Sequence, residues 1–573
     1  DEDNLEATVE RFNGFAENHE AAWEEEILTN VSSILRPGTN VVAVHGMNSS
    51  LGSSDFSFDL ELRTPQPGRS AGTPTPGSQN SAYSEQAAPQ IRQLTQIPER
   101  PTSNEAVVIS AKITDPDGIA SVNLSYQIVT PGNYVRLSDA SYDANWQSVS
   151  MSDEEGDAFY EATIPATVQQ HRRLVRYRIV MEDAVGTTLT VPYADDEQPN
   201  FAYFVYDGVP AWRGAFRPGQ TPVQTFPADL MDDLRIYHLI ANETDVINSQ
   251  YNNSFDGRHQ LGTLIYDGTV YDHITFENRG EASTYVSGKN KWRFHFNRAR
   301  KFQARDTWGR KYGSTWNKMS VDACASPWAA VNRGMAGIDE AISYRLYELA
   351  GVPSSRTHHF HFRVIDDSTE ARANDQFEGD LWGLYISIED PDGSFLDDRD
   401  LPDGNVYKIE GGSGDKKHQG PTQSTSSADW NAFRSATSRQ TEAWWRANMD
   451  LPTYYTFRGC NRITGNVDLR PGSNHYFYHH PDDYWVPLPW DLDMMYIAET
   501  HWPGIIDQEI CLQHPNIALE FRNRSRELLD LVCSDASVDG GQIGQLIDEY
   551  AQIVNPSGQD LTWADLDAVM WNM

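Results

Sequence analysis

The sequence predicts a multidomain chain in which β-sandwich modules precede a larger domain of mixed α and β structure. Its 573 residues are several times the usual domain size of about 100–200 residues. Short runs of alternating apolar and polar residues recur at even spacing before residue 210, as strands of sandwiches do. After residue 210 the chain mixes helical and strand patterns and is dense in Trp, Tyr and His.

Composition and charge exclude several classes of partner. The chain is 39% hydrophobic and 22% charged, which is typical of globular domains, and its net charge is −37. Such a surface repels phosphate backbones and anionic lipid headgroups, so we exclude nucleic acid as a partner. No run of 18 apolar residues exists, so we expect no membrane span. The chain begins at Asp1 without a signal peptide, and we interpret it as a processed or excised piece of a longer precursor.

Residues 1–64 resemble the last strands of a carbohydrate-binding β-sandwich whose beginning is missing. The stretches 40–45 and 56–62 alternate as half-buried strands do. A weak glycan contact is one interpretation, and a plain spacer module is the other. Residues 65–90 are rich in Pro, Gly, Ser and Thr and predict a flexible linker.

Residues 91–208 predict an immunoglobulin-like sandwich. Four strand patterns follow one another here: AVVISAKI, SVNLSYQIV, AFYEATIP and RLVRYRIVMED. The sequence DPDG at Asp115–Gly118 has two interpretations. It is a turn, for which Pro and Gly are ordinary residues, or its paired carboxylates bind Ca²⁺.

Residues 211–535 predict one large α+β domain. Ile338, Ile342, Leu346 and Leu349 have helical spacing, and Gly351 follows where that helix should end. The stretches FHFRVID and WGLYISIED predict strands. Residues 536–573 predict the helical start of a following, truncated segment.

The stretch from Gly465 to Tyr496 carries the chemistry. Asp468 lies in a predicted loop, Asn474 follows six residues later, and a strand then ends in PWDLD, with Asp491 and Asp493. Carboxylate and amide oxygens at strand ends can converge on Mg²⁺, Mn²⁺ or Ca²⁺. Phosphoryl transfer needs such a set, with one carboxylate for the attacking hydroxyl and other oxygens for the metal. The alternative is a structural turn in which these Asp residues cap backbone amides.

This spacing is similar to that of the catalytic loop and metal-binding Asp of protein kinases, with three departures. The Asp468–Asn474 interval is one residue longer, no His-Arg precedes Asp468, and Leu-Asp rather than Phe-Gly follows Asp491. We therefore exclude a standard protein kinase.

Several motifs in order resemble the CotH-type atypical kinases, a family named from spore-coat proteins. These motifs are FENRGEAST, GKNKWRFHF, ELAGVP, WGLYISIE, NVYKIEGG, the Asp468/Asn474 loop and PWDLD. The sequence of these motifs also resembles that of long, multidomain bacterial surface or secreted proteins in which β-sandwich modules are appended to the CotH-type domain. The resemblance implies an atypical protein-kinase-like fold and an extracellular or cell-surface location.

The resemblance also implies residue roles. Asp468 matches the catalytic Asp, Asn474 and Asp491 match metal-binding positions, and Asp493 assists them. ATP with Mg²⁺ or Mn²⁺, or Ca²⁺, is the implied cofactor set.

For the nucleotide we choose Lys289, Glu389 and Lys408. Lys is scarce in this chain, with nine residues of which eight lie between Lys289 and Lys417, so a Lys on a strand is informative. Lys291 and Arg293 are rivals of Lys289 because the strand register is uncertain. The acidic partner from the helix stays open between Glu340 and Glu348.

The implied function is ATP-dependent transfer of a phosphoryl group to Ser or Thr of a secreted or surface protein. The alternative is a non-catalytic surface or adhesion protein that keeps the fold. Because the chain is strongly acidic, we expect the acceptor segment to be basic. We expect an acidic rim around the cleft, drawn from Asp397, Asp398, Asp400, Asp482 and Asp483.

Cysteine and histidine leave further alternatives. Cys460 and Cys511, or Cys511 and Cys533, would staple the catalytic-type region if they form a disulfide, whereas buried thiols are the other interpretation. His359 and His361 share one face of a predicted strand, either as metal ligands or as structural histidines.

Overall fold

The structure is a computed structural model that describes most of the chain from residue 88 onward. The described residues are 88–251, 259–280, 289–324, 337–372, 375–410, 413–436, 440–466, 468–469, 472–496, 511–532, 541–554 and 565–566. The predicted partial sandwich at 1–64 and nearly all of the predicted linker lie outside these residues. Within the described residues, no helix combines the length and apolar character needed to cross a membrane.

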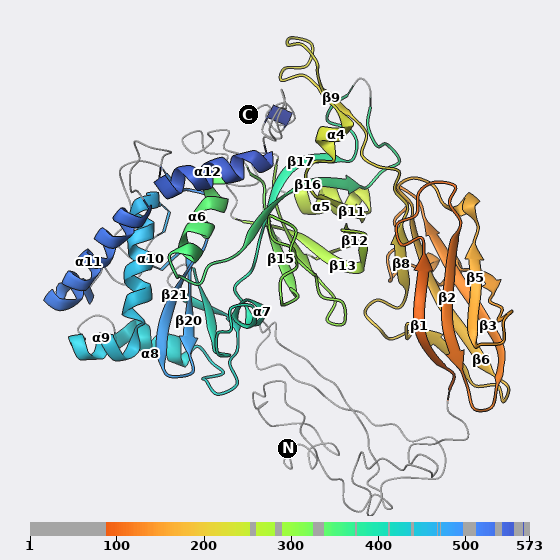
Figure 1. Cartoon of the computed structure of the whole chain (residues 1–573), viewed down its shortest axis with the longest axis horizontal. Coiled ribbons are helices and arrows are strands. Elements are labelled where there is room, and N and C mark those ends of the chain that lie inside the picture. Colours follow the sequence, from red (N-terminus) through yellow and green to blue (C-terminus); the bar gives the residue numbers. More distant parts are fainter. Residues whose placement is uncertain are drawn as a thin grey trace, which may run out of the picture.

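Residues 90–204 form two antiparallel sheets that share one core (Figure 1). The strands of the first sheet, in order, are β1 (Gln90–Ile97), β2 (Val107–Thr114) and β5 (Phe159–Ile164). The second contains β4 (Gln147–Ser150), β3 (Ile119–Val129), β6 (Leu174–Asp183), β7 (Thr188–Val191) and β8 (Phe201–Phe204), which pairs with β6. Two short helices accompany them: α3 (Ala140–Ala144) and η1 (Ala166–Val168). The four predicted strand patterns are β2, β3, β5 and β6; the comparison with immunoglobulin domains remains a prediction.

A closed seven-stranded barrel follows and lies beside the two sheets (Figure 1). Its strands, in barrel order, are β11 (Ile236–Ala241), β12 (Gln260–Tyr266), β13 (Thr269–Arg279), β14 (Lys291–His295), β15 (Lys318–Asp322), β17 (Leu381–Ile388) and β16 (Thr357–Ile365). The parallel pairing of β11 with β16 closes it, and every other neighbouring pair is antiparallel. Aromatic side chains fill the interior, including Phe276, Trp292, Phe294 and Tyr385.

Short elements adjoin the barrel. They are β9 (Trp212–Gly214), β10 (Gln224–Phe226), α4 (Ala228–Met231) and α5 (Glu243–Gln250).

In β16, His358 lies between the Tyr237 hydroxyl at 2.5 Å and the Ser387 hydroxyl at 2.7 Å. His361 Nδ1 lies 2.9 Å from the Met231 carbonyl oxygen. These contacts are those of structural histidines.

The third part of the molecule combines a four-stranded sheet with helices (Figure 1). In sheet order its strands are β19 (Ser413–His418), β18 (Val406–Glu410), β20 (His475–His480) and β21 (Tyr484–Pro489). Its helices are α6 (Ile338–Leu349), α7 (Gly393–Asp397), α8 (Ala428–Ala436), α9 (Glu442–Asn448), α10 (Leu451–Thr464), α11 (Pro515–Val532) and α12 (Gly541–Val554). Side chains of α6, α10, α11, β20 and β21 share one core.

Helix α6 joins this part to the barrel. Ile342 and Leu346 of the predicted apolar stripe are buried, but Leu349 is 54% exposed, because the helix ends at Leu349 and the chain turns away at Gly351, with φ of +93°. Helix α12, inside the predicted following segment, packs against α6.

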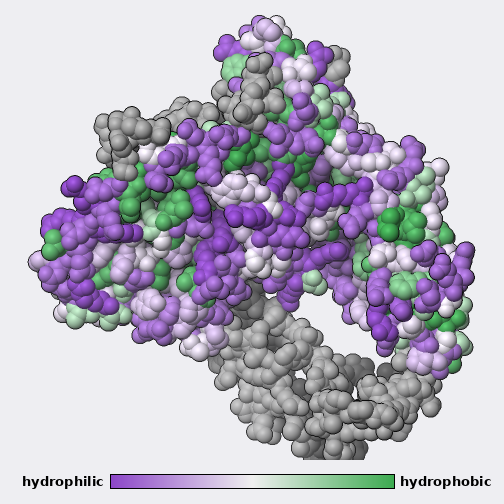
Figure 2. Space-filling model, in the orientation of Figure 1, coloured by the Kyte–Doolittle hydropathy of each residue, from purple (hydrophilic) through white to green (hydrophobic). Residues whose placement is uncertain are grey.

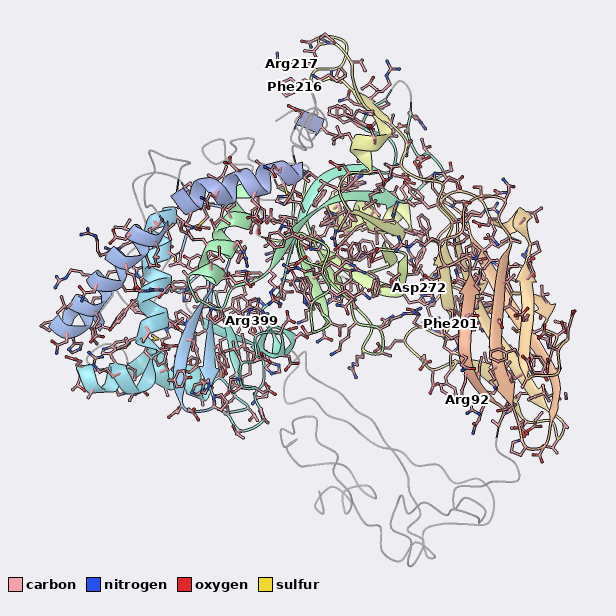
Figure 3. The ribbon with its side chains drawn as sticks, in the orientation of Figure 1. Arg92, Phe201, Phe216, Arg217, Asp272 and Arg399 are labelled. Atoms are coloured by element: carbon pink, nitrogen blue, oxygen red, sulfur yellow. The ribbon has the colours of Figure 1, made fainter. Side chains whose placement is uncertain are left out.

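The two-sheet module is joined to the barrel by buried contacts. Arg176 of β6 makes two hydrogen bonds to Asp272 of β13, at 2.7 and 3.0 Å, and both side chains are fully buried. Asn200 donates to the same carboxylate at 2.8 Å. Figure 3 shows Asp272 at this junction, with Phe201 across it. A buried apolar cluster drawn from both sides surrounds these groups, with Leu174 on one side and Val270 on the other.

Candidate functional site

The outer face of the barrel presents a lysine to carboxylates from two directions. Trp292 and Phe294 of β14 point into the barrel core, so the alternate residue Lys291 faces outward. Trp292 pairs with Val321 in the neighbouring strand, which places Lys291 opposite Asp322. The Lys291 Nζ atom lies 2.5 Å from Asp322 Oδ2 and 2.9 Å from Asp493 Oδ2. The barrel and the segment after β21 therefore meet at Lys291.

The end of the β20–β21 hairpin supplies Asn474 and Asp491. His475 pairs with Pro489 at that end of the ladder, so Asn474 and Asp491 lie just beyond it on the two strands. The Asn474 amide donates to Asp468 Oδ2 at 2.8 Å and to the Asp468 carbonyl at 3.0 Å. Asn474 and Asp491 both have positive φ, +63° and +58°, a costly backbone conformation that clusters at functional sites.

Burial and mutual repulsion raise the pKa of two carboxyls here. Burial and then the Asp493 charge raise the pKa of Asp491 to about 6. Burial, Asp322 and Asp493 raise the pKa of Glu340 well above its ordinary value. Asp493 behaves differently: burial would raise its pKa, but the charge and hydrogen bond of Lys291, together with the charge of Arg279, lower it.

Negative charge exceeds positive charge in this cluster. Four carboxylates interact here, those of Asp322, Glu340, Asp491 and Asp493, and they are opposed chiefly by Lys291 and Arg279. Uncompensated charge is costly to bury. Carboxylate oxygens with excess negative charge are the type of ligand that Mg²⁺ and Mn²⁺ prefer.

Arg279 is a member of the cluster that sequence reasoning missed. It ends β13 and pairs with Lys291 across the ladder. Its guanidinium carbon lies 5.5 Å from the centre of the Trp490 ring. Its Nη1 atom is buried and has no hydrogen-bond partner among the residues that the structure describes. The sequence could have indicated Arg279, because it lies in the FENRGEAST motif and, two positions after Glu277, faces the same outer side of the strand.

The predicted nucleotide-binding residues lie in different surroundings. The ammonium group of Lys289, the first choice, donates to the Leu384 carbonyl at 2.5 Å and lies over the Tyr385 ring at 4.5 Å. The rival Lys291 is the lysine that the structure brings to Asp493. The phosphate-binding role of either lysine stays a prediction.

Glu389 and Lys408 have their own ionic partners. Glu389 is buried and accepts two hydrogen bonds from Arg399, at 2.6 and 3.1 Å; Figure 3 labels Arg399 beside α7. Lys408 Nζ lies 3.1 Å from Glu410 Oε2. The positive charge of Lys408 also opposes the rise in the pKa of Asp491, with a smaller effect than those of Lys291 and Arg279.

The open choice between two helix acids is decided by position. Glu340 lies in the first turn of α6, is buried, and interacts with Asp322 and Lys291. Glu348 instead pairs with Arg345 at 2.6 Å. Glu340 is therefore the acid that α6 brings to the cluster.

Two other sequence alternatives also meet the structure. Asp115 and Asp117 lie with Asp183 so that one oxygen from each is within 4.8 Å of the others. Gly118 N–H donates to the Asp115 carbonyl, so the predicted turn forms, and calcium binding stays a prediction.

Cys460 and Cys511 are buried thiols, so the predicted disulfide between them is wrong. Cys533 lies outside the described residues.

The described site is a buried lysine and carboxylate cluster where a barrel meets a second lobe, an arrangement suited to cation binding. Residues 335–522 match the family model described as CotH kinase protein. The matched range contains α6, the Asp468/Asn474 loop and PWDLD, and confirms the resemblance to CotH-type proteins for these residues. Lys289, Lys291 and Arg279 precede the matched range. A comparison with curated proteins found no match.

Proposed function

We propose that the CotH-type domain transfers a phosphoryl group from ATP to a Ser or Thr hydroxyl of a secreted or surface protein. The observation that carries this proposal is the Lys291 ammonium held between Asp322 and Asp493, at 2.5 and 2.9 Å. A lysine fixed by carboxylates beside a cation-binding set is what phosphate binding and transfer require.

Each side chain has a role in this proposal. Asp491 and Asp493 would hold Mg²⁺ or Mn²⁺, and Lys291 and Arg279 would neutralise phosphate oxygens. Bound metal-ATP supplies the transferable group. Asp468, oriented by the Asn474 amide, would accept the proton of the acceptor hydroxyl as that oxygen bonds to the γ-phosphorus and the bond from this phosphorus to the leaving ADP breaks.

A non-catalytic surface or adhesion protein is the second candidate. It is favoured by the saturation of Lys291, whose ammonium already has two carboxylate partners and whose side chain is only 6% exposed. Under this function the same ion pairs hold the two lobes together and no nucleotide enters.

The two candidates differ in a direct experiment. The full chain is incubated with labelled ATP, Mn²⁺ or Mg²⁺ and candidate extracellular proteins, and nucleotide binding is followed by the thermal shift. Under the kinase proposal, Asp468→Asn abolishes transfer and keeps nucleotide binding, whereas Asp491→Asn weakens binding itself.

The matched control is Asp530→Asn on α11, where the carboxylate is 65% exposed and pairs only with Arg526 among the ion pairs of the described residues. This variant should behave as the unmodified chain. Absence of both transfer and a nucleotide-induced shift in the unmodified chain would favour the binding protein.

A further inference from the structure

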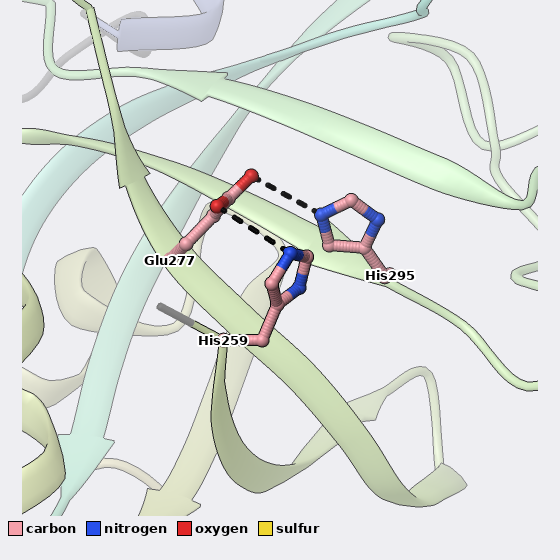
Figure 4. Close-up of side chains that lie close together, drawn as sticks. All are labelled: His259, Glu277 and His295. Carbon is pink, nitrogen blue, oxygen red and sulfur yellow. Dashed lines mark hydrogen bonds and ion pairs between the residues drawn. The ribbon is translucent and has the colours of Figure 1, made fainter. Parts of the chain in front are cut away.

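A second group of metal-ligating side chains lies on the outer face of the barrel. Its members are His259, which directly precedes β12, Glu277 of β13 and His295 of β14, and one donor atom from each lies within 4.8 Å of the others. Figure 4 shows both imidazoles directed at the Glu277 carboxylate. The neighbouring residues Phe276 and Phe294 point into the barrel core, which turns Glu277 and His295 to the same outer face.

The distances suit a shared ion. His295 Nε2 lies 3.3 Å from Glu277 Oε1, and His259 Nε2 lies 3.8 Å from Glu277 Oε2. Two ligand atoms bound at about 2.1 Å to a tetrahedral ion are about 3.4 Å apart. Little movement is therefore needed for both imidazoles and the carboxylate to bind one ion.

The surroundings orient the ligands and leave an entry path. His259 Nδ1 lies 3.3 Å from the Thr275 hydroxyl, the kind of outer contact that fixes a ligating imidazole. Glu277 is 5% exposed, whereas His259 is 48% exposed, so an ion can arrive from solvent on the His259 side.

One positive charge opposes a bound cation. Arg293 Nη1 lies 3.6 Å from Glu277 Oε1. The same guanidinium also interacts with the buried carboxylate of Asp390, so its charge is shared between two acids. The cluster therefore retains a carboxylate able to bind an ion.

This cluster is separate from the lysine and carboxylate cluster described above. His295 lies four positions after Lys291 in β14, which is about 13 Å along a strand. The chemistry also differs, because imidazole nitrogen suits Zn²⁺ and similar transition metals, whereas carboxylate oxygens suit Mg²⁺ and Mn²⁺.

We infer that His259, Glu277 and His295 form a site for a divalent transition metal of the Zn²⁺ class, with a fourth position open to water. A bound ion would fasten the start of β12 to β13 and β14 on the outer face of the barrel. This site does not depend on the proposed kinase activity.

The test is zinc titration of the chelator-treated full chain against a chromogenic zinc chelator. We expect one tight site per chain. His259→Ala and His295→Ala should each weaken zinc affinity by at least the ~10–100-fold that loss of an outer-shell partner costs. His418→Ala, which removes a histidine paired with a single acid, Asp403 at 2.5 Å, should leave zinc affinity unchanged. X-ray absorption of the zinc-loaded chain should show two imidazole ligands.

Asp491→Asn identifies the source of any residual binding. Unchanged zinc affinity in this variant, together with loss in both histidine variants, supports the site. Zinc affinity that survives both histidine variants, or that falls only with Asp491→Asn, overturns it. Because the half-exposed His259 contributes little to the core, its variant remains a valid test even if His295→Ala misfolds.

Discussion

Lys289 and Lys291 are two positions apart, yet their ammonium groups meet different neighbours. Lys289 donates to the Leu384 carbonyl, on the Tyr385 side of the barrel. Lys291 lies between Asp322 and Asp493. In a continuous strand, two residues that are two positions apart would face the same side. Lys289 and Lys291 differ because β14 begins at Lys291, so Lys289 lies before the strand.

This difference predicts unequal effects of substitution. Lys291→Gln should remove most of the Mn²⁺-ATP-induced thermal shift, and should destabilise the free chain by about 3–5 kcal/mol because it leaves buried carboxylates unpaired. Lys289→Gln should keep the nucleotide-induced shift. Each shift is measured from the variant's own melting temperature. A lost shift in Lys289→Gln alone would restore Lys289 as the phosphate-binding residue.

At the scale of elements, α6 carries a buried acid toward the seam between the barrel and the second lobe. Glu340 is 3% exposed and lies among carboxylates from β15 and the segment after β21. A helix that buries an acid whose ionisation is opposed by burial and by other acids loses stability, and such losses are often tolerated where function needs the group.

Glu340→Gln should therefore raise the melting temperature of the ligand-free chain while weakening the response to Mn²⁺-ATP. The isosteric amide removes the cost of burying an ionisable carboxyl, but it also removes the electrostatic interaction of that carboxyl with Lys291. Glu348→Gln on the same helix is the control, since Glu348 is 31% exposed and pairs with Arg345. If Glu340→Gln lowers the melting temperature, the acid stabilises the fold and the expected trade-off is absent.

Across the whole molecule, acid should weaken the joint between the two-sheet module and the barrel. Burial lowers the pKa of His273 from 6.5 to about 4, while Asp272 opposes this shift and Arg176 adds to it. His273 also faces Asn200, at 2.8 Å. Because the folded pKa is depressed, the contribution is present above pH 6.5 and lost as pH falls toward 4, by up to about 3 kcal/mol.

Asp272 adds to the loss at lower pH. Burial alone would raise its pKa, but the charges of Arg176 and His273 and the hydrogen bonds from Arg176 and Thr263 together hold the pKa well below 3.8, so its contribution falls away below about pH 4. We expect the urea midpoint to drop between pH 7 and 4.5, and His273→Gln to flatten that drop. An equally steep drop in His273→Gln would assign the pH dependence to other groups.

Net charge also acts at this scale. Figure 2 shows hydrophilic residues over most of the visible face.

The acidic rim that we expected around the cleft does not form from all of its predicted residues, because Asp398 is 4% exposed and pairs with Arg356. Asp482 and Asp483 lie in the β20–β21 turn, at the far end of the hairpin from Asn474.

The expectation of a basic acceptor thus depends on the net charge of −37 rather than on that rim. A field of this sign speeds capture of Lys- and Arg-rich segments, and the effect weakens as salt rises. A peptide-array phosphorylation assay should favour basic over acidic acceptors, most strongly at low salt. Equal or better transfer to acidic peptides would contradict it.

The sequence by itself determined the strand patterns of β2, β3, β5 and β6, the helix at α6, and the CotH-type character of residues that include Asp468, Asn474 and Asp491. These follow from local periodicity and from spacing within one loop and hairpin. Asn474 and Asp468 contact each other, as their short separation allows.

Only the tertiary structure decided which distant residues join them. Lys291, Asp322 and Glu340 come from three separate elements, and the pairing of β14 with β15 and the position of α6 bring them together. The antiparallel pairing of β13 with β12 and with β14 brings His259, Glu277 and His295 together. Periodicity shows which face of a strand a residue occupies, but strand order and register, which decide its neighbours, depend on contacts far apart in the sequence.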